Sequence, residues 1–291
     1  MEDRYSLFQQ AYEYVDGRLD VFLGQGVANA ISEVDGPLRL ALVLYVLFYG
    51  FAILRGAIQE PLMDFSIRSL KLGLIYTLAT TPAYASYVTE PLFHALPDAL
   101  ARSLGGEDTP SAAASFDSFL SRTGALGERL TEGASPIALD RWLMAGAVWI
   151  CGALAASIGF GVVLVAKVAL ALVIALGPIF IALALFEVTR RYFFGWLSQA
   201  VNYLVLFGLI FAVFQLVLGM VADQWETLQS QDAMAAGVAF IALSLLGSIF
   251  FLQTPTLAAG IAGGASVGVS DFLAAGRSVI PISQRRKGGR K

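Results

Sequence analysis

A single ionisable side chain, Lys167, stands inside an otherwise uncharged stretch that runs from Trp142 to Phe186. Placing a lysine at the centre of a bilayer costs about 2.5–3.5 kcal/mol on insertion scales, so its ammonium group should face protein, water or a lipid headgroup. Two interpretations follow: Lys167 lines a pore or substrate path, or its side chain reaches out to the charged membrane interface. The length of the stretch favours the second interpretation, and both stay open here.

The other reactive residue types form no catalytic or metal-binding pattern. Cys151 is the only cysteine and His94 the only histidine, whereas metal sites and redox pairs need several ligands or thiols. The stretch from Gly264 to Gly268 has the hydrolase spacing G-x-S-x-G, but that motif needs a preceding strand and a downstream histidine. With Gly260, its glycines instead suit either close helix packing or a flexible tail. We therefore expect no enzymatic activity, no cofactor and no metal.

The amino-acid composition is that of a membrane protein. Hydrophobic residues make up 57% of the chain and charged residues 14%, with a mean hydropathy of +0.71, whereas soluble domains are about 45–50% apolar and about 25% charged. As a helix, the stretch from Trp142 to Phe186 would reach roughly 67 Å, about twice the hydrocarbon core of a bilayer. A second uncharged run begins at Tyr192 and meets no charge until Asp223. We predict an all-α, polytopic integral membrane protein with about five transmembrane helices.

The pattern of apolar runs and charges divides the chain into five segments. They are an amphipathic N-terminal helix (1–36), two transmembrane helices joined by a short cytoplasmic loop (37–89), a central loop (90–141), a long broken transmembrane helix followed by two further crossings (142–254), and a Gly-rich basic tail (255–291).

Local signals set the expected boundaries of these helices. Because proline removes a helical hydrogen bond, Asp35-Gly36-Pro37 should end the N-terminal helix and Pro255 the last crossing. For the same reason, Gly177-Pro178 should break the long apolar helix. The residues from Asp223 to Asp232 are typical of a short acidic loop, and Ser111 to Leu130 of a modest helix.

Apolar residues near the N-terminus recur at spacings of three and four, which places them on one face of a helix. They are Tyr5, Phe8, Tyr12, Val15, Leu19 and Phe22. This stripe either packs on the rest of the same chain or docks another subunit. The spacing alone does not distinguish the two interpretations.

The distribution of charge indicates how the chain is oriented. Lys and Arg concentrate in short cytoplasmic segments of membrane proteins. If 142–186 crosses once, with the basic C-terminus in the cytoplasm, Lys and Arg are denser on the inner segments and most acidic residues lie outside. If it crosses twice, the N-terminal half of the chain has the opposite orientation. More Lys and Arg residues then lie inside than outside, but their number per residue is equal on the two sides. We prefer one crossing, with the N-terminus periplasmic and the C-terminus cytoplasmic.

Three neighbouring stretches carry a family resemblance: Ala175 to Phe186, Thr189 to Trp196, and Gln199 to Tyr203. They resemble the signature region of TrbL/VirB-type polytopic inner-membrane subunits of bacterial type IV secretion systems. The resemblance extends over about residues 36 to 270, although Glu187 stands where a small or neutral residue is expected. It implies a structural, membrane-anchoring role for Gly177, Pro178, Arg190, Arg191, Trp196 and Asn202.

The resemblance also implies a role and partners. Such a subunit would be part of an inner-membrane platform or channel that supports substrate translocation and pilus assembly. Its partners would be the minor pilin at the stalk base, the major pilin, other platform proteins, the ATPase and membrane lipid. A homo-oligomeric ring and transient contact with translocated DNA or protein are further expectations. The striped N-terminal helix would be its docking element on the periplasmic side.

The main alternative is a secondary transporter or permease for a small solute. It would use Lys167 and the broken helix as a binding site near the middle of the membrane. Against it, the chain has no internal inverted repeat and few polar residues within its apolar runs.

Overall fold

The computed structural model describes residues 6–56, 62–105, 111–135, 137–230 and 232–278. Across these ranges the chain is helical and contains no strand, which confirms the all-α prediction. The elements are α1 (Leu7–Leu54), α2 (Leu62–Thr80), the short π-helical segments η1 (Ala85–Thr89) and η2 (Pro91–Ala95), α3 (Leu96–Gly105), α4 (Ala112–Thr131), α5 (Leu139–Ala175), α6 (Gly177–Leu183), α7 (Arg190–Ser230) and α8 (Ala233–Ser278).

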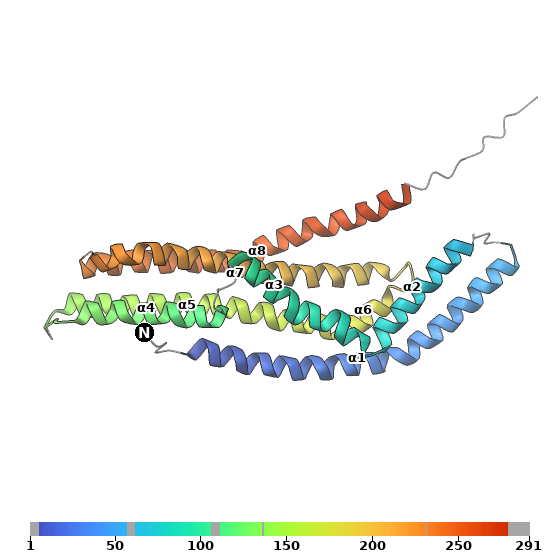
Figure 1. Cartoon of the computed structure of the whole chain (residues 1–291), viewed down its shortest axis with the longest axis horizontal. Helices are drawn as coiled ribbons and strands as arrows, with labels where there is room; N and C mark the ends of the chain where they lie inside the picture. The colour runs from blue at the N-terminus through green and yellow to red at the C-terminus, as the bar shows by residue number, and fades with distance from the viewer. Residues whose placement is uncertain (1–5, 57–61, 106–110, 136, 231, 279–291) are drawn as a thin grey trace, which may run out of the picture.

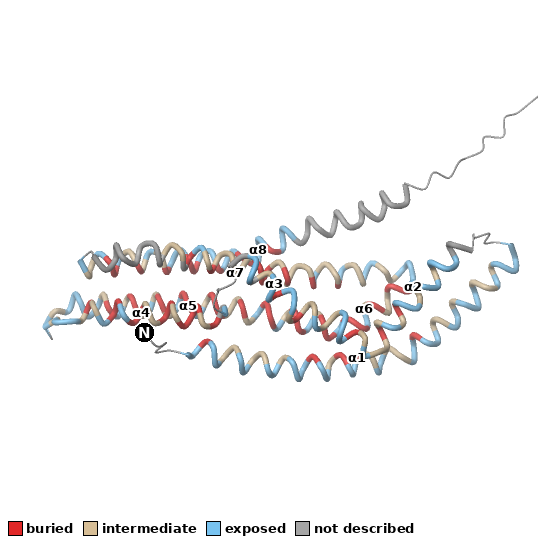
Figure 2. Tube along the Cα trace, viewed as in Figure 1, coloured by how far each residue is buried: buried red, intermediate tan, exposed pale blue. Residues whose placement is uncertain are grey.

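Helix α5 forms the centre of an elongated bundle (Figure 1). It contacts α1, α4, α7 and α8, and Figure 2 shows buried residues along much of its length. Glycines make the close approach of α4 possible: a Cβ added to Gly152 would lie 2.4 Å from the Thr123 side chain, and one added to Gly159 would lie 2.6 Å from Phe116. Small residues serve the same purpose between membrane helices generally.

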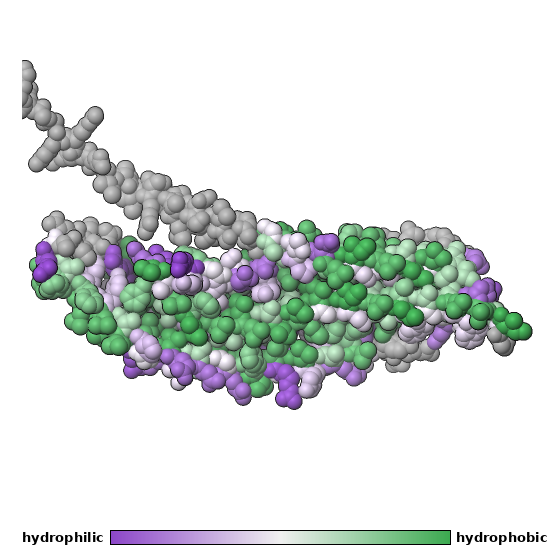
Figure 3. Space-filling model, turned by 180° about the vertical axis from the view of Figure 1, so that it is seen from behind, coloured by the Kyte–Doolittle hydropathy of each residue, from purple (hydrophilic) through white to green (hydrophobic). Residues whose placement is uncertain are grey.

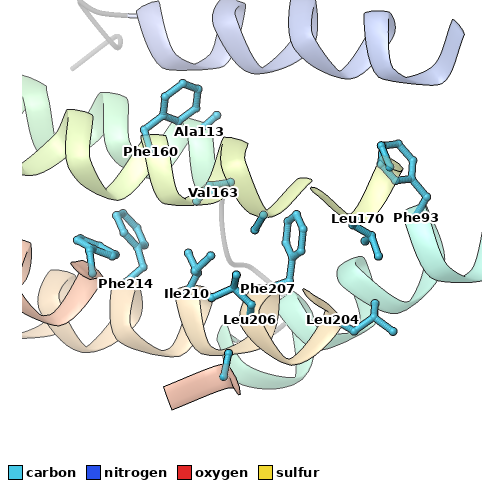
Figure 4. Close-up of a cluster of buried hydrophobic side chains, with 14 of the residues drawn as sticks. Phe93, Ala113, Phe160, Val163, Leu170, Leu204, Leu206, Phe207, Ile210 and Phe214 are labelled. Atoms are coloured by element: carbon cyan, nitrogen blue, oxygen red, sulfur yellow. The ribbon is translucent and has the colours of Figure 1, made fainter. Parts of the chain in front are cut away.

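An aromatic cluster fills the space between α4, α5, α7 and α8. The ring centroid of Phe116 lies 4.5 Å from that of Phe214, 5.8 Å from Phe251 and 6.1 Å from Phe160. Figure 4 shows Phe160 and Phe214 in this core. Phe116 belongs to the helix predicted over 111–130, within the segment 90–141. This helix is α4, and it buries its apolar face against α5.

The long apolar stretch is one continuous helix up to its predicted break. Helix α5 ends at Ala175 and α6 begins at Gly177, immediately before Pro178, so the predicted break at Gly177-Pro178 is confirmed. Between Leu139 and Ala175 the chain does not fold back on itself.

Two predicted helix ends are wrong. Helix α1 continues through Asp35-Gly36-Pro37, and α8 continues through Pro255 as far as Ser278. Both prolines are exposed, so their rings displace no neighbouring element. Residues 1–36 are therefore not a separate helix, and the tail 255–291 is helical as far as its described residues reach.

Two other local predictions have different outcomes. The helix predicted over 111–130 is confirmed as α4, and the Ser111 hydroxyl caps it by accepting a hydrogen bond from the Ala114 N–H at 3.2 Å. The acidic loop predicted over 223–232 is wrong for most of its length, because the backbone of α7 remains helical to Ser230.

Helices α1 and α5 lie side by side and run in the same direction. The ring of Phe8 lies 4.9 Å from that of Phe160, and a Cβ on Gly26 would lie 3.2 Å from the Cβ of Ala175. Residue numbers thus rise together along both helices. Their N-terminal ends lie toward the same end of the bundle.

The molecule is a multi-pass membrane protein. Among the described residues, four helices are long and apolar enough to cross a bilayer: Leu7–Leu54, Leu139–Ala175, Arg190–Val217 and Ala233–Ile261. Helix α2, which lies in the segment 37–89 where two transmembrane helices were predicted, is not among them. Figure 3 shows the broad hydrophobic surface that these helices present, as expected of a surface that faces lipid.

Candidate functional site

Lys167 of α5 is buried against the N-terminal half of α1. Only 5% of the residue is exposed. Its ammonium group donates a hydrogen bond to the Tyr12 hydroxyl at 2.8 Å and forms an ion pair with the Asp16 carboxylate. The Lys167 nitrogen also lies 4.3 Å from the ring centroid of Tyr12 and 5.1 Å from that of Phe93. The positive charge is therefore compensated within the protein by a carboxylate and two aromatic faces.

The ammonium group faces α1 and η2, which agrees with the expectation that it face protein. Its role at a pore or at the membrane interface stays a prediction. Asp16 is the partner that sequence reasoning missed. The sequence signal for Asp16 was its position four residues after Tyr12, at the edge of the apolar stripe of the N-terminal helix, which must pack against another surface.

A second carboxylate holds the start of α1. Asp117 of α4 is buried, and its two oxygens accept hydrogen bonds from the backbone N–H groups of Phe8 and Gln9, each at 3.0 Å. The first N–H groups of a helix have no partner within the helix, and the helix dipole favours a negative charge there. Further along α1, the carboxylate of Asp20 lies 3.3 Å from Nε2 of His94.

The residues of the predicted stripe fall into three groups. Phe8 is buried, Tyr12, Val15 and Leu19 are half-buried, and Phe22 is exposed. Tyr5 lies outside the described residues. The stripe thus packs largely on its own chain, and docking of another subunit on this helix stays a prediction.

The residues of the signature region meet at the break between α5 and α6. Pro178 has no N–H, so the carbonyl of Ile174, four residues earlier, cannot receive its usual helical hydrogen bond. The Tyr84 hydroxyl donates to this carbonyl at 2.6 Å, and Nε1 of Trp196 donates to the carbonyl of Val173 at 2.7 Å. Side chains from two other elements therefore stabilise the end of α5.

Gly177 is required by the same arrangement. A Cβ at this position would lie 1.8 Å from the Tyr84 hydroxyl oxygen and 2.9 Å from the Trp196 ring. The structure thus brings Gly177, Pro178 and Trp196 together, with Tyr84 as a partner that the sequence did not indicate.

The remaining predicted residues lie apart from this junction. Arg190 lines a cavity, and its Nε is buried without a hydrogen-bond partner. Arg191 is exposed and donates to the Tyr192 hydroxyl at 2.9 Å. Oδ1 of Asn202 is buried and has no hydrogen-bond partner. These residues do not converge with Lys167 on a common site.

The observed contacts can join helices but do not assemble a reaction centre. Over the part of the chain that the structure describes, no group of three or more His, Cys, Asp or Glu residues is placed to hold a metal ion. The charged groups around Lys167 instead fix α1 on α5. The candidate site is therefore a structural joint between helices.

Comparison with known proteins identifies the family. The model of the family described as "TrbL/VirB6 plasmid conjugal transfer protein" matches residues 42–254. Two curated relatives are each named "Type IV secretion system protein VirB6". The protein from Bartonella henselae is 26% identical and that from Bartonella quintana 24% identical; each match spans 98% of this chain and 89% of the relative. The chain belongs to the TrbL/VirB6 family of plasmid conjugal transfer proteins.

Proposed function

We propose that this chain is a membrane component of a type IV secretion system and acts as a platform subunit in the inner membrane. Family membership over residues 42–254 and the names of the two curated relatives support the secretion-system assignment. No observation favours the rival transporter, because the buried Lys167 is engaged by Asp16.

The proposed orientation places the N-terminus and the segment 90–141 in the periplasm, and Arg190 and Arg191 in the cytoplasm. The parallel arrangement of α1 and α5 supports it, because both helices would then enter the membrane from the same side. The concentration of acidic residues in the two periplasmic segments and of Lys and Arg in the others agrees with this direction. Five crossings remain our proposal for the number of transmembrane helices.

The observation that carries the platform role is the fixed position of α1. Asp117 holds the start of the helix, and Asp16 joins it to Lys167. The opposite face of α1 bears exposed apolar side chains, with Tyr14 64% and Val21 57% exposed. We propose that this outer face, and not the stripe that packs inward, contacts a periplasmic partner such as the minor pilin.

The remaining partners follow from the role of a platform subunit. We propose contacts with the major pilin, other inner-membrane subunits and the ATPase, and assembly of several copies into a ring. Substrate DNA or protein would contact the ring transiently during export.

Site-specific crosslinking tests this function. In a chain with Cys151→Ser, single cysteines would replace Tyr14 or Val21 on the outer face, and Leu23 or Val27 on the buried face as matched controls. We expect the outer-face cysteines to form adducts with the minor pilin in cells that assemble the machine. Adducts from neither face, or equal adducts from both, would contradict the proposed surface.

A further inference from the structure

A cavity of about 990 Å³ lies between α1, α2 and the turn that joins α6 to α7. This volume is at the upper end of the range of roughly 300–1,000 Å³ found for ligand-binding pockets. It is distinct from the Lys167 joint, which lies further toward the N-terminus of α1. Neither the joint nor the broken helix uses this cavity.

The charged residues that line the cavity are predominantly basic. Arg68, Lys71 and Arg190 contribute positive charges, and Glu187 contributes the one negative charge of the lining. Three cations against one acid give the lining a net positive charge, and basic pockets between transmembrane helices suit anionic headgroups. The lining therefore has the charge complementary to an anionic ligand.

Two observations describe how the cationic side chains of the cavity are held. Nη1 of Arg68 donates to the Tyr45 hydroxyl at 3.2 Å, and its guanidinium lies 4.8 Å from the ring centroid of Tyr49. These contacts fix the direction of Arg68. Nε of Arg190 is buried and has no hydrogen-bond partner, although it is a strong donor.

The other walls are apolar and aromatic. Tyr45 and Tyr49 stack with centroids 6.2 Å apart, and the ring of Phe186 lies 6.4 Å from Tyr45. Leu44 and Ile67 also line the cavity, and both are exposed at the surface of the helices. The same cavity thus offers cations for a headgroup and apolar walls for the chains attached to it.

From this combination we infer that the cavity binds an anionic glycerophospholipid, with the phosphate near Arg68 and Arg190 and the acyl chains along α1 and α2. Basic pockets between transmembrane helices are suited to anionic headgroups. The site does not depend on the proposed function. With the proposed orientation, the cavity would lie in the cytoplasmic leaflet.

Lipid retention in nanodiscs tests the inference. The purified chain would be placed in nanodiscs of phosphatidylcholine that contain a small fraction of phosphatidylglycerol, and the bound lipid measured by native mass spectrometry. We expect phosphatidylglycerol to be retained over phosphatidylcholine, and Arg190→Gln to weaken its retention about tenfold or more, because a charge-assisted hydrogen bond is lost. Arg191→Gln is the matched control, since Arg191 is adjacent, exposed and outside the cavity.

A second variant keeps every charge and fills the space. Ala52 lines the cavity, so Ala52→Trp should exclude phosphatidylglycerol while the protein remains folded by circular dichroism. Inorganic phosphate, added at the same concentration, should not displace the lipid, because it lacks the acyl chains. Equal retention of both lipids, equal losses in the Arg190 and Arg191 variants, retention unchanged by Ala52→Trp, or displacement by phosphate alone would overturn the inference.

Discussion

The ammonium group of Lys167 in α5 lies against the carboxylate of Asp16 in α1, so the one charge of the apolar stretch 142–186 is neutralised by the N-terminal helix. The ion pair joins two elements that are far apart in the sequence. It also gives α1 a fixed position on the bundle, on which the proposed outer surface depends.

Removing both members of this pair should destabilise the protein by less than the sum of removing each one alone. Asp16→Asn should lower the free energy of unfolding by about 2–3 kcal/mol, because it leaves a buried ammonium group without a counter-charge. The double variant Asp16→Asn/Lys167→Met should lose less free energy of unfolding than the two single variants together, by at least about 1 kcal/mol. Unfolding in mixed micelles, followed by circular dichroism, measures these differences. Glu13→Gln, at an exposed position of the same helix, is the control, and strictly additive losses would refute the coupling.

Loss of the Asp117 carboxylate should release the start of α1. Asp117→Ala removes the acceptor for two backbone N–H groups, so we expect a cost of about 1–2 kcal/mol, as for the loss of a helix cap. Hydrogen–deuterium exchange of the amides over 7–27 should become faster, while exchange in the interior of α5 stays slow. Asp98→Ala is the control, because Asp98 is an exposed acid in the first turn of α3. Unchanged exchange over 7–27 would show that the cap does not hold α1.

A methyl group at Gly177 should disrupt the junction of α5 and α6. The Cβ of Gly177→Ala would overlap the Tyr84 hydroxyl, and such overpacking costs about 1–3 kcal/mol. Gly161→Ala in the same long helix is the matched control, because a Cβ there meets nothing within 4 Å; it should stabilise the helix by about 0.5–1 kcal/mol. Thermal unfolding in detergent measures both variants. Equal effects of the two substitutions would contradict the crowded junction.

The hydroxyl of Tyr84 should matter only while Pro178 is present. Tyr84→Phe leaves the buried carbonyl of Ile174 unsatisfied and should cost about 1–3 kcal/mol. In a Pro178→Ala background the new N–H can donate to the same carbonyl, so Tyr84→Phe should then cost less than half as much. A double-mutant cycle on unfolding free energies measures the difference, with Tyr87→Phe as an exposed control. An equal cost in both backgrounds would show that the hydroxyl does not replace the missing bond.

Apolar runs and local breakers predicted much of the fold. The helical membrane architecture, the break at Gly177-Pro178 and the helix over 111–130 follow from composition and short-range signals. Pro37 and Pro255 misled the boundary predictions, because a proline removes one hydrogen bond and does not by itself end a long helix when its ring is exposed.

Local sequence signals could not predict the contacts of the candidate site. The spacing of apolar residues placed Tyr12 on one face of a helix, and the long apolar stretch made Lys167 stand out as its single charge. Neither pattern shows which helix packs against these residues. Asp117 stood in the helix predicted over 111–130, but its role at the start of α1 depended on how α4 packs on α1 and α5. Tyr84 and Trp196 likewise act on a helix end that only the tertiary structure brings near them.

The orientation of the chain is tested most directly by labelling single cysteines with a membrane-impermeant maleimide in cells whose outer membrane is permeable. In a Cys151→Ser chain, cysteines would replace Tyr14 and Ser135 for the periplasmic side and the exposed Val188 for the cytoplasmic side. We predict that positions 14 and 135 react in intact cells and that position 188 reacts only after lysis. Labelling of position 188 in intact cells, with protection of positions 14 and 135, would contradict it.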